Sequence, residues 1–355
     1  MSEFKVVTSG GSYSVRIQTG AASAVVADSQ LVLIDEYVQE HVLASQAAAT
    51  IVVPGNEDTK TLSGCEAILI KMNEAGARRG DALVAVGGGA IQDAATLVAS
   101  LYMRGLPWKY CPSTAMAMAD SCIGGKSSIN VSGIKNLVGN IYPPDQVVVD
   151  PSLATDLPIE AKVSGLAEAV KICFAAGGES FAKYLDVAVP AAEFGGTPAT
   201  EALLDHVLRA KKWFIEIDEF DKNERQLLNF GHTYAHAFES ATTFAVPHGV
   251  AVAVGVLGAC AHRGSATTDF AQSLKAYCIS LLQPVKWKIV SATTEIDWTA
   301  FERAVLTDKK GTREEIRLVL PVEAGGVAVH AFPRTDEELA EVKRSMIEAL
   351  AEVGG

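Results

Sequence analysis

The stretch LVAVGGGAIQDAATLVAS, residues 83–100, predicts the fold more clearly than any other part of the sequence. It begins with four apolar residues, continues through Gly87, Gly88 and Gly89, and ends in an apolar pattern with helical spacing. A glycine turn between a buried strand and a helix lets the backbone approach a pyrophosphate, whose charge is stabilised at the helix N-terminus. The spacing is not GxGxxG, and such a turn can form without a ligand. The stretch therefore predicts a strand, a turn and a helix, and leaves dinucleotide binding open.

Three more apolar runs, at 31–34, 51–53 and 147–149, are typical of buried strands, and helical patterns lie between them at 61–77 and 91–102. Continuous apolar strands separated by helices predict a parallel sheet covered on both faces. Later in the chain, long helical patterns rich in alanine and leucine dominate. We therefore predict an α/β Rossmann-like nucleotide-binding domain over 1–155 and a mainly α-helical domain over 156–355. The second domain is expected to include a strand pair, 316–321 with 327–330, and a terminal helix that opens with a capping box, Thr335 to Glu338.

Composition and charge argue against several classes of protein, namely non-specific nucleic-acid-binding, membrane-binding and membrane-spanning proteins. The chain has 355 residues, of which 49% are hydrophobic, and a formal net charge of -12. This charge argues against non-specific binding to nucleic acid or to anionic membranes, which requires a basic surface. The longest apolar run, Gly249 to Ala261, is shorter than the ~20 residues of a membrane-spanning helix, and it predicts a buried helix. The six cysteines form no CxxC pair and the first residues are not typical of a signal peptide, so we expect reduced thiols in a cytoplasmic protein.

Two segments concentrate polar residues among apolar ones. The first runs from Asp120 through Gly124-Gly125-Lys126 to Lys135-Asn136, and its two lysines suggest an anion cradle. The alternative is a solvated loop, which its isoleucine neighbours make less favourable. In the second segment, the residues Arg225, Asn229, His232 and His236 are spaced 4, 3 and 4, which predicts one polar stripe on a helix.

Two histidines on that stripe, followed by His248, predict a metal site. His232 and His236 alone would be an HxxxH metal pair, and Glu168 could supply a third ligand. Spacing does not decide which histidines bind the metal.

Taken together, these motifs resemble the sugar-phosphate cyclases, the family of 3-dehydroquinate synthase. The similar stretches run from about Leu31 to Pro321. In chain order they are the triple glycine, Arg104-Gly105, DSxxGGKxxxN from Asp120, Lys135-Asn136, SGLAExxK from Ser164 and NxGHxxxHA from Asn229. The resemblance implies a dehydroquinate synthase-like fold, in which an NAD-binding domain precedes a helical metal- and substrate-binding domain. It also implies a homodimer.

The resemblance assigns the metal and substrate residues. It implies the metal ligands Glu168, His232 and His248, which places His236 in the phosphate pocket instead. Phosphate or neighbouring hydroxyls would be contacted by Lys126, Asn136 and one of Lys309 and Lys310, with Arg104 reaching phosphate from the partner subunit. The carboxylate and hydroxyl side of the substrate would be held by Lys211, Arg225 and Asn229. Asp120 would orient Lys126 and Asn229, and Lys171 is a further expected catalytic residue.

The expected cofactors are NAD and a divalent cation, zinc or cobalt. NAD would contact Asp35, Glu57, Lys60, Gly87, Gly88, Gly89, Asp93, Ser113, Thr114 and Lys135. Three protein ligands leave the metal an open position for substrate oxygens. The implied reaction is a transient oxidation by NAD, elimination of phosphate, re-reduction and an intramolecular aldol closure, without net redox change.

The favoured substrate is 3-deoxy-arabino-heptulosonate 7-phosphate, which the family converts to 3-dehydroquinate in the shikimate pathway of aromatic amino acid biosynthesis. Its carboxylate calls for a bidentate cation, and both Arg225 and Asn229 are present. The nearest alternative is the amino analogue, followed by the substrates of 2-deoxy-scyllo-inosose and epi-valiolone synthases. Phe220 and Gly177 depart from the common family pattern and suggest a divergent member.

Two other classes of function compete with the cyclase. An NAD-dependent polyol dehydrogenase would explain a metal and NAD, but not the many cationic residues suited to phosphate. A catalytically inactive relative would be expected to have lost metal or phosphate residues, and these residues are present.

Overall fold

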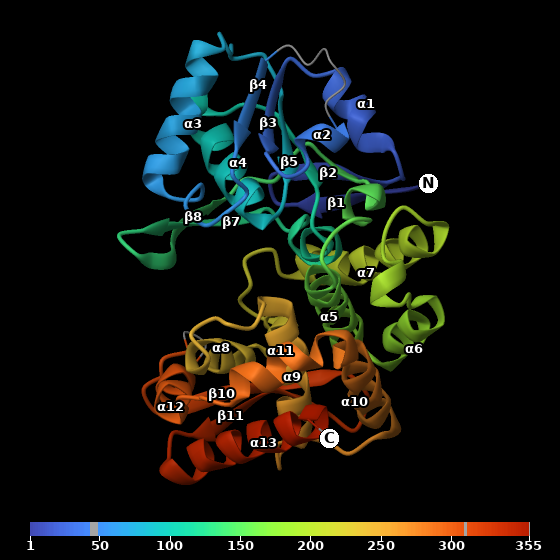
Figure 1. Ribbon diagram of the computed structural model, residues 1–355, viewed down its shortest axis with the longest axis vertical. Helices are drawn as coiled ribbons and strands as arrows, with labels where there is room; N and C mark the ends of the chain where they lie inside the picture. The colour runs from blue at the N-terminus through green and yellow to red at the C-terminus, as the bar shows by residue number, and fades with distance from the viewer. Residues whose placement is uncertain (43–48, 309–310, 355) are drawn as a thin grey trace. The chain divides into compact units, whose positions relative to one another are not determined.

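The computed structural model describes residues 1–42, 49–308 and 311–354. The chain forms two compact units, one of residues 1–157 and 193–219 and the other of residues 158–192 and 220–355. Figure 1 shows the elements of each unit. Lys309 and Lys310, two predicted phosphate contacts, lie outside the described residues.

The first unit is built on a seven-stranded sheet with the strand order β1-β2-β9-β6-β5-β3-β4. Neighbouring strands are parallel except for the antiparallel pair β1 and β2. The strands are β1 (Ser2–Thr8), β2 (Gly11–Ile17), β3 (Leu31–Asp35), β4 (Ala49–Val53), β5 (Leu83–Gly87), β6 (Trp108–Pro112) and β9 (Gln146–Val149). The predicted parallel sheet is therefore confirmed.

Helices cover both faces of this sheet. They are α1 (Ala21–Ala27), α2 (Gln39–Val42), α3 (Leu62–Glu74) and α4 (Gly89–Leu101). Val32 and Ile34 of β3 pack in one buried cluster with residues of α1 and α2. Because side chains alternate along a strand, Leu33 points to the opposite face, which α4 covers, and it too is fully buried. In Figure 1, α3 and α4 lie on one side of the sheet and α1 on the other.

The strand register brings several predicted cofactor residues to one edge of the sheet. Ile34 is paired with Val86, and Gly87 is paired with Pro112. The carboxyl ends of β3, β5 and β6 therefore coincide, and they carry Asp35, the glycine turn and Ser113-Thr114. Ligands of open α/β sheets bind at this edge.

The segment predicted to be an anion cradle is a π-helical turn followed by a hairpin. The turn is η2 (Ala117–Ser121), and the hairpin joins β7 (Lys126–Val131) to β8 (Ile134–Ile141). β8 is exposed over almost its entire length. The lysines of the segment thus lie on strands and not in an irregular loop.

The helix α7 (Pro198–Ile217) corrects the predicted domain boundary. A single boundary at 155/156 places this helix in the second domain, but residues 193–219 belong to the first unit. Glu216 of α7 accepts a hydrogen bond from the backbone of Val7 at 2.8 Å, and Glu201 pairs with the N-terminal amine at 3.0 Å. A helical pattern reports secondary structure and not the partner against which the helix packs.

The second unit surrounds a central helix, α9 (His248–Ala261). Every residue from Gly249 to Ala259 is buried, which confirms the predicted buried helix. The other helices are α5 (Ile159–Ala175), α6 (Gly178–Val187), α8 (His232–Ala241), α10 (Asp269–Leu282), α11 (Lys286–Thr293), α12 (Trp298–Leu306) and α13 (Asp336–Gly354). Among the described helices, none combines the length and apolar character needed to cross a bilayer.

The predicted strand pair and terminal helix are also present in this unit. β10 (Glu315–Pro321) pairs with β11 (Val327–Pro333) in antiparallel fashion. At the start of α13, the backbone of Glu338 donates to Thr335 Oγ1 at 3.3 Å, which is half of a capping box. The Glu338 side chain instead contacts His262 Nε2 at 2.9 Å and pairs with Arg263 at 2.7 Å.

Candidate functional site

The second unit contains a buried carboxylate, Glu168, in the middle of α5. Its side chain is 2% exposed, and its Oε2 lies 2.5 Å from Nζ of Lys171, one helical turn later. A buried charge is costly unless it is paired. Burial by itself would raise the pKa of the Glu168 carboxyl, but Lys171 and His248 together hold that pKa well below its usual range. Glu168 is thus an ionised carboxylate in the protein interior.

Two imidazoles face this carboxylate. The distance to Glu168 Oε1 is 3.7 Å from His232 Nε2 and 3.4 Å from His248 Nε2. His232 is the first residue of α8 and His248 is the first residue of α9, so both project from helix starts beside α5. Potential ligand atoms of all three residues lie within 4.8 Å of one another. One carboxylate and two imidazoles form the donor set of a catalytic zinc-type site with an open position.

The prediction that Arg225, Asn229, His232 and His236 share one helix is wrong. The first two lie on a 3₁₀ helix, η5 (Glu224–Asn229), and α8 begins only at His232. Gly231 separates the two helices with a positive φ of 75°. A Cβ on Gly231 would lie 2.8 Å from the backbone nitrogen of Val256 in α9, so close packing enforces this glycine turn.

His236 lies one turn after His232 on α8 and is exposed. Its ring centroid is 5.5 Å from that of His232 and 5.8 Å from that of His248. His236 also belongs to a second group of possible ligands, together with Glu239 and His248. His236 therefore lies beside the group formed by Glu168, His232 and His248. The Nε2 atoms that face Glu168 are those of His232 and His248.

His248 contacts a second carboxylate. Its Nδ1 lies 3.1 Å from Oε1 of Glu239 in α8. Burial lowers the pKa of His248, but hydrogen bonds and charge interactions with Glu168 and Glu239 outweigh burial and raise the pKa to about 10. A cation bound at Nε2 therefore displaces a proton from this imidazole.

In the first unit, the glycine turn lies between β5 and the N-terminus of α4. Tyr110 Oη of β6 donates to the carbonyl of Gly87 at 2.9 Å and to that of Gly88 at 3.2 Å. A Cβ on Gly87 would lie 2.4 Å from Ile91, and a Cβ on Gly88 would lie 2.8 Å from Thr114, whereas nothing lies within 4 Å of a Cβ on Gly89. The free space is beside Gly89, where backbone amides at the helix start can receive a phosphate.

Lys60, a predicted cofactor contact, is the centre of a polar network in the first unit. Its Nζ lies 3.0 Å from Asp93 Oδ2, 3.0 Å from Asn136 Oδ1 and 3.6 Å from Glu57 Oε1. Burial raises the pKa of Asp93, although Lys60 opposes this effect. Asn130 Nδ2 donates to Glu57 Oε2 at 2.8 Å. The structure thus joins three predicted cofactor residues to Asn136, a predicted phosphate ligand.

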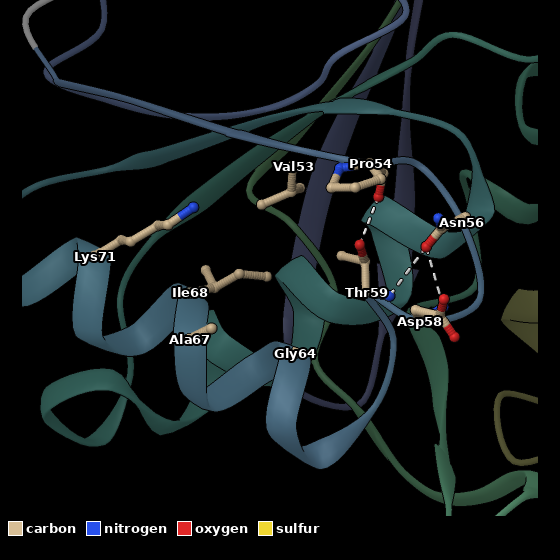
Figure 2. Close-up of a pocket in the computed structure, with 9 residues that line it drawn as sticks. All are labelled: Val53, Pro54, Asn56, Asp58, Thr59, Gly64, Ala67, Ile68 and Lys71. Atoms are coloured by element: carbon tan, nitrogen blue, oxygen red, sulfur yellow. Dashed lines mark hydrogen bonds between the residues drawn. The ribbon is translucent and has the colours of Figure 1, made fainter.

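The loop that carries Glu57 and Lys60 is braced by a local turn. Asn56 Oδ1 accepts hydrogen bonds from the backbone of Asp58 at 3.1 Å and of Thr59 at 3.3 Å, and Thr59 Oγ1 donates to the carbonyl of Pro54 at 2.5 Å (Figure 2). These residues line a cavity of about 290 Å³ between the end of β4 and α3. No residue that lines this cavity is among the predicted site residues.

Lys211, a predicted substrate contact, lies on α7 and is buried. Its Nζ is 2.5 Å from Asp120 Oδ1 and also donates to the carbonyls of Asp120 and Ile123. It therefore holds the turn that precedes Lys126, the first residue of β7, whose side chain is exposed.

The remaining predicted residues lie in varied surroundings. Arg225 is 7% exposed, and Asn229 Nδ2 donates to the carbonyl of Gln226 at 3.0 Å. Arg104 is exposed and has a positive φ of 72°. Lys135 is exposed on β8.

Two residues that contact the site were not predicted, namely Tyr110 and Glu239, whereas Asn130 is the asparagine that ends the predicted DSxxGGKxxxN motif. A signal existed for Glu239, because it follows His232 by seven positions and so lies on the same face of α8. Tyr110 and Asn130 reach their partners only through sheet register and loop packing.

Two protein-family models match consecutive parts of the chain. Residues 50–164 match a family described as 3-dehydroquinate synthase N-terminal, and residues 165–311 match 3-dehydroquinate synthase C-terminal. A 3-dehydroquinate synthase of Natranaerobius thermophilus is 33% identical over 83% of this chain and 81% of that protein. A 3-dehydroquinate synthase of Saccharolobus solfataricus is 31% identical over 91% of each protein.

Solved structures share the fold. A 2-deoxy-scyllo-inosose synthase complexed with carbaglucose-6-phosphate, NAD+ and Co2+ has a TM-score of 0.80 at 22% identity, covering 98% of this chain and 99% of that one. The 2-epi-5-epi-valiolone synthase ValA of Streptomyces hygroscopicus, with NAD+ and Zn2+ bound, has a TM-score of 0.78 at 21% identity, covering 99% of both. A glycerol dehydrogenase of Schizosaccharomyces pombe has a TM-score of 0.62 at 14% identity, covering 96% of this chain and 89% of that one. The shared fold by itself does not distinguish cyclase from dehydrogenase.

Proposed function

This chain belongs to the 3-dehydroquinate synthase family, and from this premise we propose that it converts 3-deoxy-arabino-heptulosonate 7-phosphate into 3-dehydroquinate and inorganic phosphate. The observation that carries the proposal is the convergence of Glu168, His232 and His248 on one point of the second unit. The proposed enzyme is a carbon–oxygen lyase, and NAD is regenerated in each cycle. Its six cysteines are free thiols, which suits the cytoplasm.

The donor set fits a divalent cation, and we propose zinc or cobalt. When bound, the cation supplies Lewis acidity toward adjacent substrate oxygens, and NAD supplies a reversible hydride acceptor. Glu168 is already ionised beside Lys171, so this ligand needs no deprotonation. The carbonyl of Phe230 lies 3.2 Å from His232 Nδ1 and can only accept a hydrogen bond. This contact supports a proton on Nδ1 and Nε2 of His232 as the proposed ligand atom.

The chain's own residues supply position and charge to the substrate. We propose that Lys126, Asn136 and His236 bind the phosphate and that Arg225 and Asn229 bind the carboxylate. Lys211 holds Asp120 and the turn before Lys126 in place. Lys60 and Asp93 would both contact NAD, because they form an ion pair with a distance of 3.0 Å from Nζ to Oδ2.

A homodimer is also part of the proposal. Large apolar side chains are exposed along β8, where Ile134 is 55% and Leu137 is 52% exposed. Leu101 and Met103, at and just after the end of α4, are also exposed, and α4 contacts β8. An apolar surface of this kind is typical of a protein–protein interface. Arg104 directly follows Met103, so such an interface would carry it toward a partner subunit.

The proposed function is tested by offering four phosphates to the purified chain with NAD and zinc or cobalt. The four are the heptulosonate 7-phosphate, its amino analogue, sedoheptulose 7-phosphate and glucose 6-phosphate. We expect release of phosphate from the heptulosonate without accumulation of NADH, and a carbocyclic product by mass spectrometry. Accumulation of NADH with glycerol and no release of phosphate would instead indicate a polyol dehydrogenase.

Replacing Arg225 with alanine is expected to lower kcat/KM for the heptulosonate by about 10- to 100-fold. A hydrogen bond to a charged group contributes about 1.5–3 kcal/mol, and the guanidinium is the proposed bidentate partner of the carboxylate. Arg225→Lys keeps the charge but loses the planar fork, so it should recover only part of the activity. Steady-state kinetics provide the measurement, and an unchanged kcat/KM in Arg225→Ala would reject the carboxylate clamp.

Alanine substitutions at Gly87 and Gly89 are expected to have different effects on the stability of the protein. Gly87→Ala should lower the free energy of unfolding by about 1–3 kcal/mol, because its Cβ would overlap Ile91. Gly89→Ala meets no atom and starts a helix, so stability should stay unchanged or rise by up to about 1 kcal/mol. The same methyl group occupies the space proposed for the pyrophosphate, so affinity for NAD should fall by about 10- to 100-fold.

Denaturant titration and calorimetric titration with NAD measure the two effects separately. If Gly89→Ala bound NAD as tightly as the wild type, the pyrophosphate would have to bind elsewhere.

A further inference from the structure

The buried carboxylate of Glu239 lies outside the set of residues proposed to bind metal, substrate or NAD. Glu239 is 8% exposed and lies near the end of α8, seven residues after the first residue of that helix, His232. Seven residues are close to two helical turns, so both side chains lie on the same face of α8. From that face, Glu239 Oε1 reaches Nδ1 of His248 at 3.1 Å.

The two proposed imidazole ligands have matching surroundings. The Nδ1 atom of His232 lies 3.2 Å from the carbonyl oxygen of Phe230, and Nδ1 of His248 lies 3.1 Å from the carboxylate of Glu239. In both rings the opposite nitrogen, Nε2, faces Glu168 Oε1. An acceptor at Nδ1 keeps the proton on that nitrogen, fixes the ring plane and leaves the lone pair of Nε2 for a cation.

We propose that Glu239 is a positioning residue that orients His248 for metal binding, as the carbonyl of Phe230 does for His232. The inference rests on the proposed function in one respect, since it takes Glu168, His232 and His248 as the ligand set. It adds that metal binding by these three ligands depends on Glu239, a carboxylate that is not itself a ligand. A carboxylate at Nδ1 also makes the His248 imidazole a stronger donor to the cation than a backbone carbonyl would.

A competing interpretation makes Glu239 itself a ligand, since Glu239, His236 and His248 also lie within reach of one ion. The 3.1 Å contact favours positioning, because it is a hydrogen bond that uses Nδ1 of His248. His236 is moreover exposed, whereas Glu168 of the other group is buried beside Lys171. The two interpretations predict different numbers of bound ions.

The experiment measures cobalt binding to the full chain, by competition with a chromophoric chelator and by the visible absorption of the bound Co²⁺. We expect Glu239→Ala to weaken binding by about 10- to 100-fold and to shift the absorption bands, because the His248 ring is no longer held. Glu239→Gln keeps an acceptor oxygen without the charge and should lie between alanine and wild type. A purely structural role for Glu239 would not move the cobalt spectrum.

Glu338 offers a matched control in the same unit. It is a buried glutamate whose Oε1 lies 2.9 Å from Nε2 of the buried His262, remote in sequence from the proposed ligands. Glu338→Gln should lower thermal stability but leave cobalt affinity and spectrum unchanged. Circular dichroism shows whether each variant is folded, and Glu239→Gln carries the test if Glu239→Ala is not.

The outcomes separate the inference from the proposed function. Wild-type cobalt affinity in folded Glu239→Ala overturns the inference and leaves the proposed function intact. Two cobalt ions per wild-type chain, of which Glu239→Ala loses one, overturn it in favour of the second ligand group. Failure of the wild type to bind cobalt would reject the metal site itself, and the proposed function with it.

Discussion

Replacing His232 with alanine is expected to remove the divalent cation and to lower kcat/KM by about 10³-fold. His232 is one of three residues whose ligand atoms converge in the second unit. Loss of one of the three proposed protein ligands should leave a site that no longer retains the cation. Lewis-acid catalysis contributes several kcal/mol, and about 4 kcal/mol corresponds to three orders of magnitude in rate. Elemental analysis of the purified variant and steady-state kinetics provide the two measurements.

His236→Ala is the matched control for this prediction. His236 lies one turn along the same helix, and the spacing of the two residues fits an HxxxH metal pair. Because Nε2 of His232 and of His248 face Glu168, we expect His236→Ala to keep one metal ion per chain while losing activity. Loss of metal in His236→Ala with retention in His232→Ala would contradict the proposed ligand set.

Replacing Lys171 with methionine is expected to lower the free energy of unfolding of the metal-free protein by about 3–5 kcal/mol. Lys171 and Glu168 are both 2% exposed and lie 2.5 Å apart, so the substitution leaves a buried carboxylate without its nearest cation. Removing one partner of a buried ion pair typically has a cost of this size. Burial, which raises the pKa of Glu168, is then opposed mainly by His248.

A bound cation should restore part of this stability, because it supplies the missing positive charge. At a concentration of about 100 times the dissociation constant, a ligand stabilises the folded state by about 2.7 kcal/mol. Denaturant titrations with and without zinc measure both quantities. The double variant Lys171→Met with Glu168→Gln removes both charges and should be more stable than Lys171→Met alone. If it were less stable, the pair would not be the source of the effect.

Secondary structure could be predicted where hydrophobic patterning is strong. The cores of β3, β4, β5 and β9 are apolar runs, and each was predicted as a strand. β1 and β2 were not predicted, because they lie at one edge of the sheet and alternate buried with exposed residues. The exposed strand β8 carried no burial signal at all. Patterning reports burial, so strands with one or two exposed faces are difficult to recognise.

The site residues show a similar division. The family resemblance implied the ligand set Glu168, His232 and His248, whereas spacing left the choice among the histidines open, with His232 and His236 as a possible HxxxH pair. The predicted stripe failed because a helical count cannot detect a break at Gly231, which close packing against α9 imposes. The assignment of α7 to the first unit depended on contacts with β1 and β2, which its own sequence does not encode.

The family of this protein, the order of its motifs and the types of side chain available for metal, phosphate and dinucleotide could be inferred from the amino-acid sequence alone. Those properties depend on the identity and order of residues that are close together along the chain. The packing of the folded chain was needed to show which nitrogen of each histidine faces Glu168, that Glu239 contacts Nδ1 of His248, and that the open space of the glycine turn lies beside Gly89. These features arise where α5, α8 and α9, or β5, β6 and α4, meet. Their atoms become neighbours only when distant segments pack together.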